Sequence, residues 1–230
     1  LLPLLVDHDR GGEDDCGQDA EDYGHGPDGA AAAHQEEAEK LYNRAIEICE
    51  KDIQNYHRAL KFSLNGLANI YRSRGKYEEA EAYLKRALAI EEKAAGKDSA
   101  DSAEILNSIA RLYRAEGRYS EAQAALKEVM AIGEKTLGAN NPLMKPYLNN
   151  LATVLFYQKK YDEAEPLLER ILDMDEKSTG TNSTVLITDL NNLAAVYANQ
   201  KKFGDAELLY TRAAHICQNF SNDPRELATV

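Results

Sequence analysis

Apolar residues recur through most of the chain at spacings of three and four, which is the period of an α-helix with one buried face. The pattern is clearest in the segment 148–174, LNNLATVLFYQKKYDEAEPLLERILDM. It returns every 42 residues without a gap. Five alanines mark this interval: Ala38, Ala80, Ala122, Ala164 and Ala206. A repeat of this length predicts a row of stacked helical units rather than one globular core.

Each full repeat is predicted to hold two helices, called helix A and helix B below. In the first full repeat, helix A has Leu64 and Leu67 on its apolar face, and helix B has Leu84 and Ala87. A short turn joins the two, with the sequences RGKY, EGRY, QKKY and QKKF in successive repeats. Short turns place the two helices of a pair antiparallel to one another. The fold class predicted from this pattern is all-α.

The turns differ at one position. Gly75 and Gly117 suit a left-handed cap at the end of helix A, but the third and fourth repeats have Lys159 and Lys201 there. Glycine adopts the left-handed conformation without a steric penalty, whereas lysine does not. We therefore expect the two lysines either to accept this strain or to form another type of turn.

The repeat pattern sets the expected boundaries. Residues 1–34 have no helical or strand period and read as an acidic flexible leader, although Ala30–Ala33 are expected to begin the first helix. The expected helix A partner of this first helix, residues 20–34, contains Gly24, Gly26, Pro27 and Gly29. We therefore expect this segment not to hold a regular helix. The expected solenoid covers 35–220, with a single leading helix at 35–51 and pairs at about 56–94, 98–137, 141–178 and 183–219. Residues 221–230 form a tail or begin a further helix.

The net charge of the chain limits the classes of molecule that it is expected to bind. The chain carries a formal net charge of −12, but residues 1–34 hold nine acids against the single base Arg10. The repeats therefore carry only about −4. Nucleic-acid binding is not expected, since it requires a broad basic surface. No apolar run is long enough to span a membrane, and we expect a soluble, cytoplasmic protein.

The residues give no indication of catalysis. The five histidines do not pair with carboxylates at metal-ligand spacing, so we expect neither a metal nor another cofactor. No glycine-rich phosphate loop follows a strand. Glu78, Glu79 and Glu81 recur at the start of each helix B and read as solvated acids favoured by the helix dipole. The expected protein is not an enzyme.

These residues resemble the tetratricopeptide repeat. The 42-residue spacing, together with LNNLA, KKYDEAEPLLERIL and EKTLGANNP, is similar to the kinesin light chain type. The resemblance covers about residues 35–220. It implies a right-handed α-solenoid of antiparallel helix pairs, with the A helices lining a concave groove that binds extended peptides.

Carried over by position, the resemblance implies a set of groove residues on the A helices. In the first two repeats these are Asn65, Asn69, Arg72, Asn107, Ser108, Arg111 and Arg114. In the last two they are Asn149, Asn150, Thr153, Phe156, Tyr157, Asn191, Asn192 and Asn199.

Asparagine is a poor residue for a helix interior. Its amide both donates and accepts hydrogen bonds, so a row of asparagines suits the backbone of an extended ligand. Alternatively, each asparagine bonds a neighbouring helix and sets the stacking angle. The arginines and the aromatic residues of the set favour a ligand that is acidic at one end and hydrophobic at the other. A solvated helix face with scattered arginines is the other interpretation.

The leader has a similar composition to such a ligand. Leu1 to Asp9, LLPLLVDHD, places leucines before acids. It looks like the leucine and acid segment with which kinesin light chains occlude their own groove. We hypothesise that it binds the groove of the same molecule until a cargo peptide displaces it. A solvated linker is the alternative.

The predicted function is thus non-catalytic binding of a protein segment, as an adaptor or assembly scaffold. Two alternatives remain open at the level of sequence. The chain could be a structural subunit that docks into a larger complex by the convex face formed by its B helices. It could also be the regulatory repeat domain of a longer enzyme or signalling protein.

Overall fold

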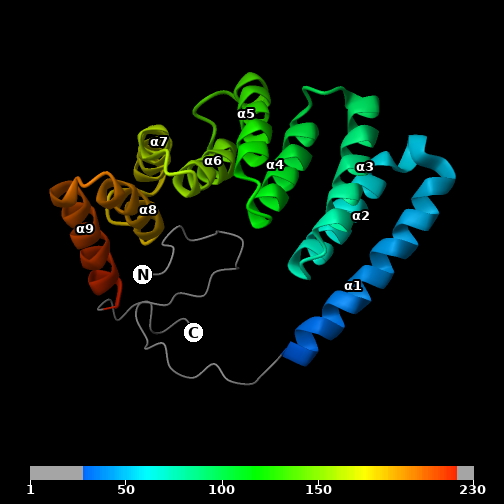
Figure 1. Cartoon of the computed structure of the whole chain (residues 1–230), viewed down its shortest axis with the longest axis horizontal. Coiled ribbons are helices and arrows are strands. Elements are labelled where there is room, and N and C mark those ends of the chain that lie inside the picture. The colour runs from blue at the N-terminus through cyan, green and yellow to red at the C-terminus, as the bar shows by residue number, and fades with distance from the viewer. Residues whose placement is uncertain (1–27, 222–230) are drawn as a thin grey trace. The chain divides into compact units, whose positions relative to one another are not determined.

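The computed structural model of the protein describes residues 28–221, and over this range the chain is helical without any strand (Figure 1). The all-α prediction is therefore confirmed. The helices are α1 Asp28–Cys49, α2 Ile53–Ser73, α3 Tyr77–Ala95, α4 Ala100–Ala115, α5 Tyr119–Thr136, α6 Lys145–Tyr157, α7 Tyr161–Thr179, α8 Leu186–Asn199 and α9 Phe203–Ser221. Two 3-10 turns, η1 Glu50–Asp52 and η2 Pro142–Met144, precede α2 and α6. The predicted leader up to residue 27, including Leu1 to Asp9, and the predicted tail after Ser221 lie outside this range.

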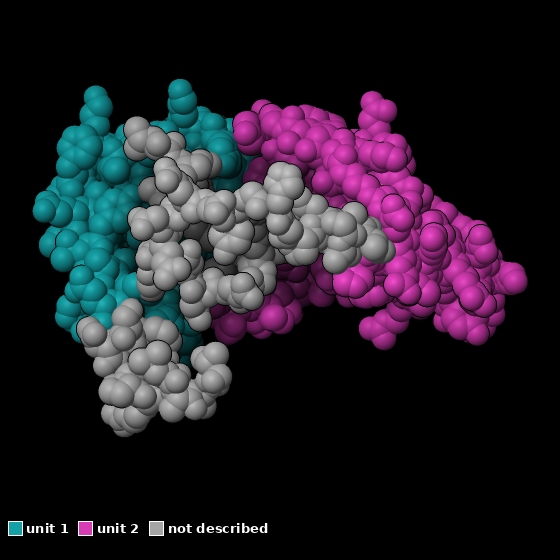
Figure 2. Space-filling view, turned by 90° about the horizontal axis from the view of Figure 1, so that it is seen from below, with its two compact units in different colours: residues 1–19, 148–230 teal, residues 20–147 magenta. Residues whose placement is uncertain are grey.

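The chain divides into two compact units, which are described separately (Figure 2). Unit 2 covers residues 20–147 and holds α1 to α5. The described part of unit 1 covers residues 148–221 and holds most of α6 together with α7, α8 and α9.

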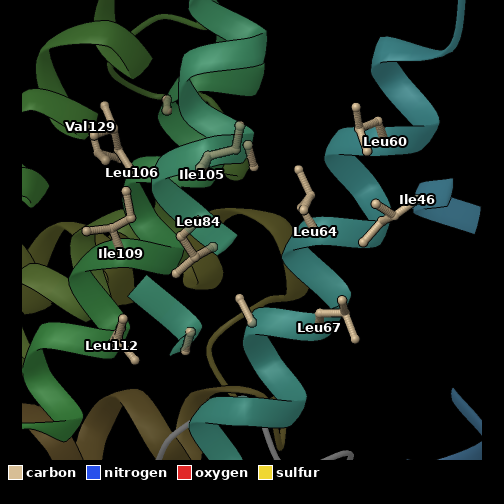
Figure 3. Close-up of a cluster of buried hydrophobic side chains, with 14 of the residues drawn as sticks. Ile46, Leu60, Leu64, Leu67, Leu84, Ile105, Leu106, Ile109, Leu112 and Val129 are labelled. Carbon is tan, nitrogen blue, oxygen red and sulfur yellow. The ribbon is translucent and has the colours of Figure 1, made fainter. Parts of the chain in front are cut away.

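Unit 2 has a continuous apolar core (Figure 3). Leu60, Leu64 and Leu67 on α2 are fully buried, as predicted from the spacing of three and four. They pack with Leu84 on α3 and with a row of residues on α4 that includes Leu112. Burying one such leucine stabilises the fold by roughly 2 kcal/mol. The core therefore joins successive helices, as expected of a stacked array.

In unit 1 the same registers form a smaller cluster. Leu186 and Leu190 on α8 are fully buried against Ala213 and Ile216 on α9. Leu172 on α7 packs against the same cluster. Helix α8 thus contacts both the helix before it and the helix after it.

All four A-to-B turns have the left-handed conformation. The φ angles are 71° at Gly75, 77° at Gly117, 61° at Lys159 and 65° at Lys201. In the glycine turn the backbone N–H of Lys76 donates to the carbonyl of Tyr71 at 2.9 Å. The equivalent bond in the lysine turn, from Lys160 to Leu155, is also 2.9 Å. The lysines therefore accept the strain, at a cost of roughly 1 kcal/mol each, because the bonds require this turn.

Polar side chains cap the starts of A helices. Before α2, Asp52 accepts a hydrogen bond from the backbone N–H of Asn55 at 3.3 Å. Ser99 accepts a hydrogen bond from the backbone N–H of Ser102 at 2.9 Å. Asn141 accepts one from Leu143 at 3.0 Å, directly before η2. Pro142 lies at the first position of that turn, where a missing N–H costs little.

Helix α1 includes Ala30–Ala33, as expected, but it begins before the predicted solenoid boundary at residue 35. It starts at Asp28, seven residues before the equivalents of the other B-helix starts, and it includes Gly29. The alanine run 30–33 explains this, since alanine is the best helix former and offsets one glycine in the first turn. As a result, α1 continues through the register at which the other repeats turn: Ala33 occupies the position of Gly75.

None of the helices between Asp28 and Ser221 combines the length and apolarity that a membrane crossing requires.

Candidate functional site

In unit 2, the polar side of each A helix carries one stripe of residues that the core does not cover. On α2 the stripe consists of Phe62, Asn65, Asn69 and Arg72, spaced by three and four residues. These four are called the α2 stripe below. Phe62 is 67% exposed, and the other three are partly buried. The fully buried Leu64 and Leu67 lie on the other side of the helix.

Helix α4 carries the equivalent stripe, which is called the α4 stripe. It consists of Glu104, Asn107, Arg111 and Arg114. Glu104 is exposed, and the other three are partly buried. Because α2 and α4 contact each other directly within unit 2, the two stripes lie on neighbouring helices. Together they present three guanidinium groups, the exposed carboxylate of Glu104, several amides and one exposed phenyl ring.

In unit 1, the same positions are less polar. On α6 these positions hold Asn149, Thr153 and Phe156. On α8 they hold Asn191, Ala195 and Ala198. Phe156 packs edge-on against Tyr161, with ring centroids 5.4 Å apart, and also contacts Tyr157. Tyr157 is 39% exposed. The predicted aromatic residues therefore form one cluster in this unit.

The register one residue further along faces the preceding B helix instead. A Cβ added at Gly66 on α2 would lie less than 3 Å from the ring of Tyr42 on α1. The equivalents of Gly66 are Ser108, Asn150 and Asn192, which are 9%, 8% and 1% exposed. Burial at these positions favours the stacking role over ligand contact, because an extended peptide reaches only the exposed side of a helix.

Two further predicted side chains are bonded within their own helices. The hydroxyl of Thr153, which is 3% exposed, donates to the carbonyl of Asn149 at 2.8 Å. The amide of Asn199 donates to the carbonyl of Ala195 at 2.8 Å. The hydroxyl of Ser108 likewise donates to the backbone carbonyl of Glu104 at 3.3 Å. Such bonds within a helix occupy the donors that a ligand would otherwise use.

Asn65 behaves differently. Its side-chain oxygen is buried and has no hydrogen-bond partner. An unpaired buried acceptor costs roughly 1 to 3 kcal/mol. Because this atom has almost no solvent-accessible surface, its unpaired state is a cost within the fold and does not mark an acceptor open to a ligand.

A second polar arrangement holds the A helices of unit 2 against the preceding B helices. The hydroxyl of Tyr113 on α4 donates to Glu81 on α3 at 2.9 Å, and Arg118 donates to the other oxygen of Glu81 at 2.9 Å. Arg118 also stacks over the Tyr113 ring, 4.1 Å from its centroid. Although burial acts to raise the pKa of Glu81, hydrogen bonds from Lys85, Arg118 and Tyr113 lower it to about 2.

The same arrangement, a glutamate on a B helix that accepts hydrogen bonds from a tyrosine and an arginine of the next repeat, occurs one repeat earlier and is called a clasp below. Tyr71 donates to Glu39 at 2.9 Å and Arg74 donates to it at 2.5 Å. The hydrogen bond to Glu39, followed by burial, raises the pKa of Tyr71 to about 12. In unit 1, Glu165 accepts from Gln200 at 2.7 Å and from Lys202 at 2.8 Å.

These clasps correct the sequence interpretation. Glu81 was expected to be a solvated acid, yet its side chain is only 16% exposed and carries three hydrogen-bonding partners. The signal that could have revealed it in unit 2 is the pairing of two registers, since Glu39 and Glu81 recur in step with Tyr71 and Tyr113. In unit 1, Tyr197 donates instead to Glu169 at 3.0 Å. Phe62 was also missed, since its equivalents are Glu104, Pro146 and Thr188.

Within residues 28–221, no group of three histidine, cysteine, aspartate or glutamate side chains is placed to hold a metal ion. The side chains of the α2 and α4 stripes are suited to hydrogen bonding, ion pairing and apolar contact.

Comparison with protein families gives one consistent match. A family model described as tetratricopeptide repeat matches residues 30–93, 58–135 and 144–219. A second model with the same description matches residues 107–180. No curated protein sequence matches the chain.

Solved structures show the same fold. BtubC (BKLC) from P. vanneervenii has a TM-score of 0.75 at 21% identity, over 84% of this chain and 77% of that one. A putative kinesin light chain with nearly identical TPR-like repeats, from Podosopora anserina, has a TM-score of 0.71 at 24% identity, over 84% and 92%. PilF from Pseudomonas aeruginosa has a TM-score of 0.52 at 19% identity, over 79% and 78%.

Proposed function

Since the chain belongs to the tetratricopeptide repeat family, whose members are generally protein–protein interaction modules, we propose that it binds an extended segment of a partner protein along its A helices. The α2 and α4 stripes of unit 2 form the main contact surface. The protein then acts as an adaptor or an assembly scaffold and performs no catalysis.

The neighbouring α2 and α4 stripes are the observation that carries this proposal. Arg72, Arg111 and Arg114 are partly exposed on two helices in direct contact. Guanidinium groups pair with carboxylates in two parallel hydrogen bonds, which favours an acidic ligand. Phe62 supplies an exposed apolar surface at the other end of the α2 stripe. Asn65 and Asn69 are partly exposed between these two features along the helix.

The expected ligand is a short segment with apolar residues followed by acids. Each hydrogen bond contributes roughly 1 kcal/mol net, and the peptide loses conformational entropy when it binds. Micromolar affinity is the consequence for a single short motif.

A titration with a labelled peptide of leucines followed by aspartates tests the proposal. Arg111→Glu is expected to weaken binding about tenfold or more, because it places a like charge opposite the acids of the peptide. Lys127→Glu is the matched control: it makes the same charge change at an exposed position on α5. Binding that both variants weaken equally would reject the A-helix stripes as the contact surface and would indicate only a net-charge effect.

Phe62→Ser provides a test that does not involve charge. It is expected to weaken the same peptide about fivefold without changing stability much, since Phe62 is mostly exposed. An apolar contact at Phe62 also predicts that a peptide with serines in place of the leucines binds equally well to wild type and variant.

The leader hypothesis involves residues outside the described range, and it makes a separate prediction. Removing residues 1–15 is expected to increase the affinity for the acidic peptide if Leu1 to Asp9 competes for the stripes. Unchanged affinity would reject the competition without affecting the proposed peptide contact.

Docking by the B helices is the alternative that a specific observation favours. Phe203 and Leu208 on α9 are 67% and 70% exposed. If this face holds the partner, then Leu208→Glu abolishes capture of the partner from a lysate, while Arg111→Glu does not.

A further inference from the structure

Helix α1 has a B-type sequence, and among residues 28–221 no helix A of its own repeat covers it, so that its apolar face is largely exposed. Leu41 is 62% exposed and Ile48 is 51% exposed. The equivalents of Ile48 in later repeats include Ile132 and Ile216, which are 4% and 2% exposed. Figure 1 shows α1 at the edge of its unit, where it packs on α2.

The small residues of α1 show the same difference. Ala38 and Ala45 are partly exposed, whereas Ala80 and Ala87 at the same registers in α3 are fully buried. In α3 the helix A of the same repeat, α2, provides the cover. The open face of α1 is therefore the face on which every later B helix packs against its own helix A.

The sequence directly before α1 does not follow the helix A pattern of the later repeats. A helix A of this repeat would need a turn at the register of Gly75, but Ala33 stands there within a continuous helix. Further upstream, the registers of Leu64 and Leu67 are occupied by Asp22 and His25. Neither residue can replace the buried leucines of a helix A.

The open face matches a second copy of itself. Ala38, Leu41, Ala45 and Ile48 are spaced by three, four and three residues, which is the pattern of the seam between two paired helices. In an antiparallel pair, Leu41 of one copy lies opposite Ala45 of the other, and Ala38 lies opposite Ile48. Each layer then places one large residue against one small residue, which is how paired helices fill the space between them.

The charges beside the seam select the antiparallel direction. Glu37 and Arg44 on α1, and Lys51 in the following 3-10 turn η1, lie at intervals of seven residues beside the seam, and all three are exposed. In the antiparallel pair, Glu37 of each copy lies beside Lys51 of the other. The two Arg44 side chains approach one another at the centre and oppose association. The flank thus provides two attractive contacts and one repulsive contact.

We propose that two copies of this chain associate through an antiparallel pair of α1 helices. One helix from each copy provides a contact of modest size compared with the interfaces of permanent dimers. The expected dissociation constant is therefore roughly 10 μM. The contact does not involve the α2 and α4 stripes, so it adds to the proposed peptide binding.

Sedimentation equilibrium of the full chain from about 1 to 200 μM tests the association. Wild type is expected to shift from monomer to dimer over this range. Leu41→Glu and Ile48→Glu are expected to remain monomeric, and both side chains are exposed enough for the monomer to stay folded. Leu208→Glu, at an exposed leucine on α9, is the matched control and is expected to dimerise as wild type does.

The charged flank gives a test of direction. Glu37→Lys and Lys51→Glu are each expected to weaken dimerisation about fivefold, whereas the double variant restores it, since the two charges exchange places. Arg44→Gln is expected to strengthen it. A double variant that remains as weak as the single ones would overturn the antiparallel pairing.

The same experiments identify other occupants of the face. A wild type that stays monomeric at 200 μM overturns the proposal. If a variant without residues 1–27 dimerises although the full chain does not, then the leader covers α1 in the same molecule, which also overturns it. A dimer that Leu41→Glu leaves intact would place the interface on another surface.

Discussion

Lys61 on α2 lies 3.4 Å from the carboxylate of Glu91 on α3, and the Glu91 residue is only 2% exposed. Lys61 also pairs with Asp101 on α4 at 2.5 Å. The hydroxyl of Ser99, which caps α4, donates to Glu91 at 3.1 Å. One lysine therefore links three successive helices of unit 2 at the end where α3 passes into α4.

Replacing Lys61 is expected to destabilise unit 2 strongly. Lys61→Met removes the positive charge beside buried Glu91, and breaking a buried pair from one side costs about 3 kcal/mol or more. Urea unfolding followed by circular dichroism measures the change. Adding Glu91→Leu to this variant is expected to recover part of the loss, because no unpaired carboxylate remains. Lys127→Met, at an exposed position, should change stability by less than about 0.5 kcal/mol.

Gly66 is expected to accept a side chain only if the ring of Tyr42 moves away. Gly66→Ala pushes a methyl group into the Tyr42 ring, and overpacking of this kind costs roughly 1 to 3 kcal/mol. Tyr42→Leu introduces the residue found at the same register in α3, Leu84. The double variant is expected to be more stable than Gly66→Ala alone. Equal stability of the two would show that the loss has another origin.

Glycine is expected to stabilise the two lysine turns of the chain. Lys159→Gly and Lys201→Gly relieve a left-handed conformation that side chains disfavour. Each variant is expected to gain about 1 kcal/mol in the free energy of unfolding. The larger conformational entropy of glycine in the unfolded chain reduces this gain. Thermal unfolding should show a higher midpoint for both variants. Lys160→Gly, one residue further along, is the control and should be destabilising or neutral.

Stability is expected to fall in acid through Glu81. Its pKa is lowered from the usual 4.5 to about 2 in the folded protein, so its contribution is complete above about pH 4.5. The contribution is lost as the pH falls from about 4.5 to about 2, because the unfolded state takes up the proton first. Glu81→Gln should flatten the dependence of the unfolding free energy on pH in this interval and cost about 2 kcal/mol near neutral pH. An unchanged slope would contradict the clasp.

The helices and turns could be predicted because both depend on local pattern. The apolar period identified the buried faces around Leu64 and Leu190, and the gapless repeat placed Lys159 at the register of Gly75. The start of α1 could not be placed as well, since the alanine run competes with Gly29 and only the folded chain shows which prevails.

The assignment of residues to the candidate site was less complete. Asn149 and Asn150 are adjacent and equally polar, so composition does not tell them apart. The structure separates them by about 100° around α6, which leaves Asn149 partly exposed and Asn150 buried. The clasp of Tyr113 and Glu81 joins residues 32 positions apart, and a helical period alone does not report such a contact.

The fit of Tyr42 against Gly66 also bears on how the chain could have evolved by exchange of its repeats. The other A helices have serine or asparagine at the register of Gly66, and any of them placed after α1 would push a Cβ into the aromatic ring. Recombination that shuffles whole 42-residue segments would keep the period yet lose this match. Neighbouring repeats therefore have side chains of matching size where they meet, so that each repeat packs well only beside its own neighbour.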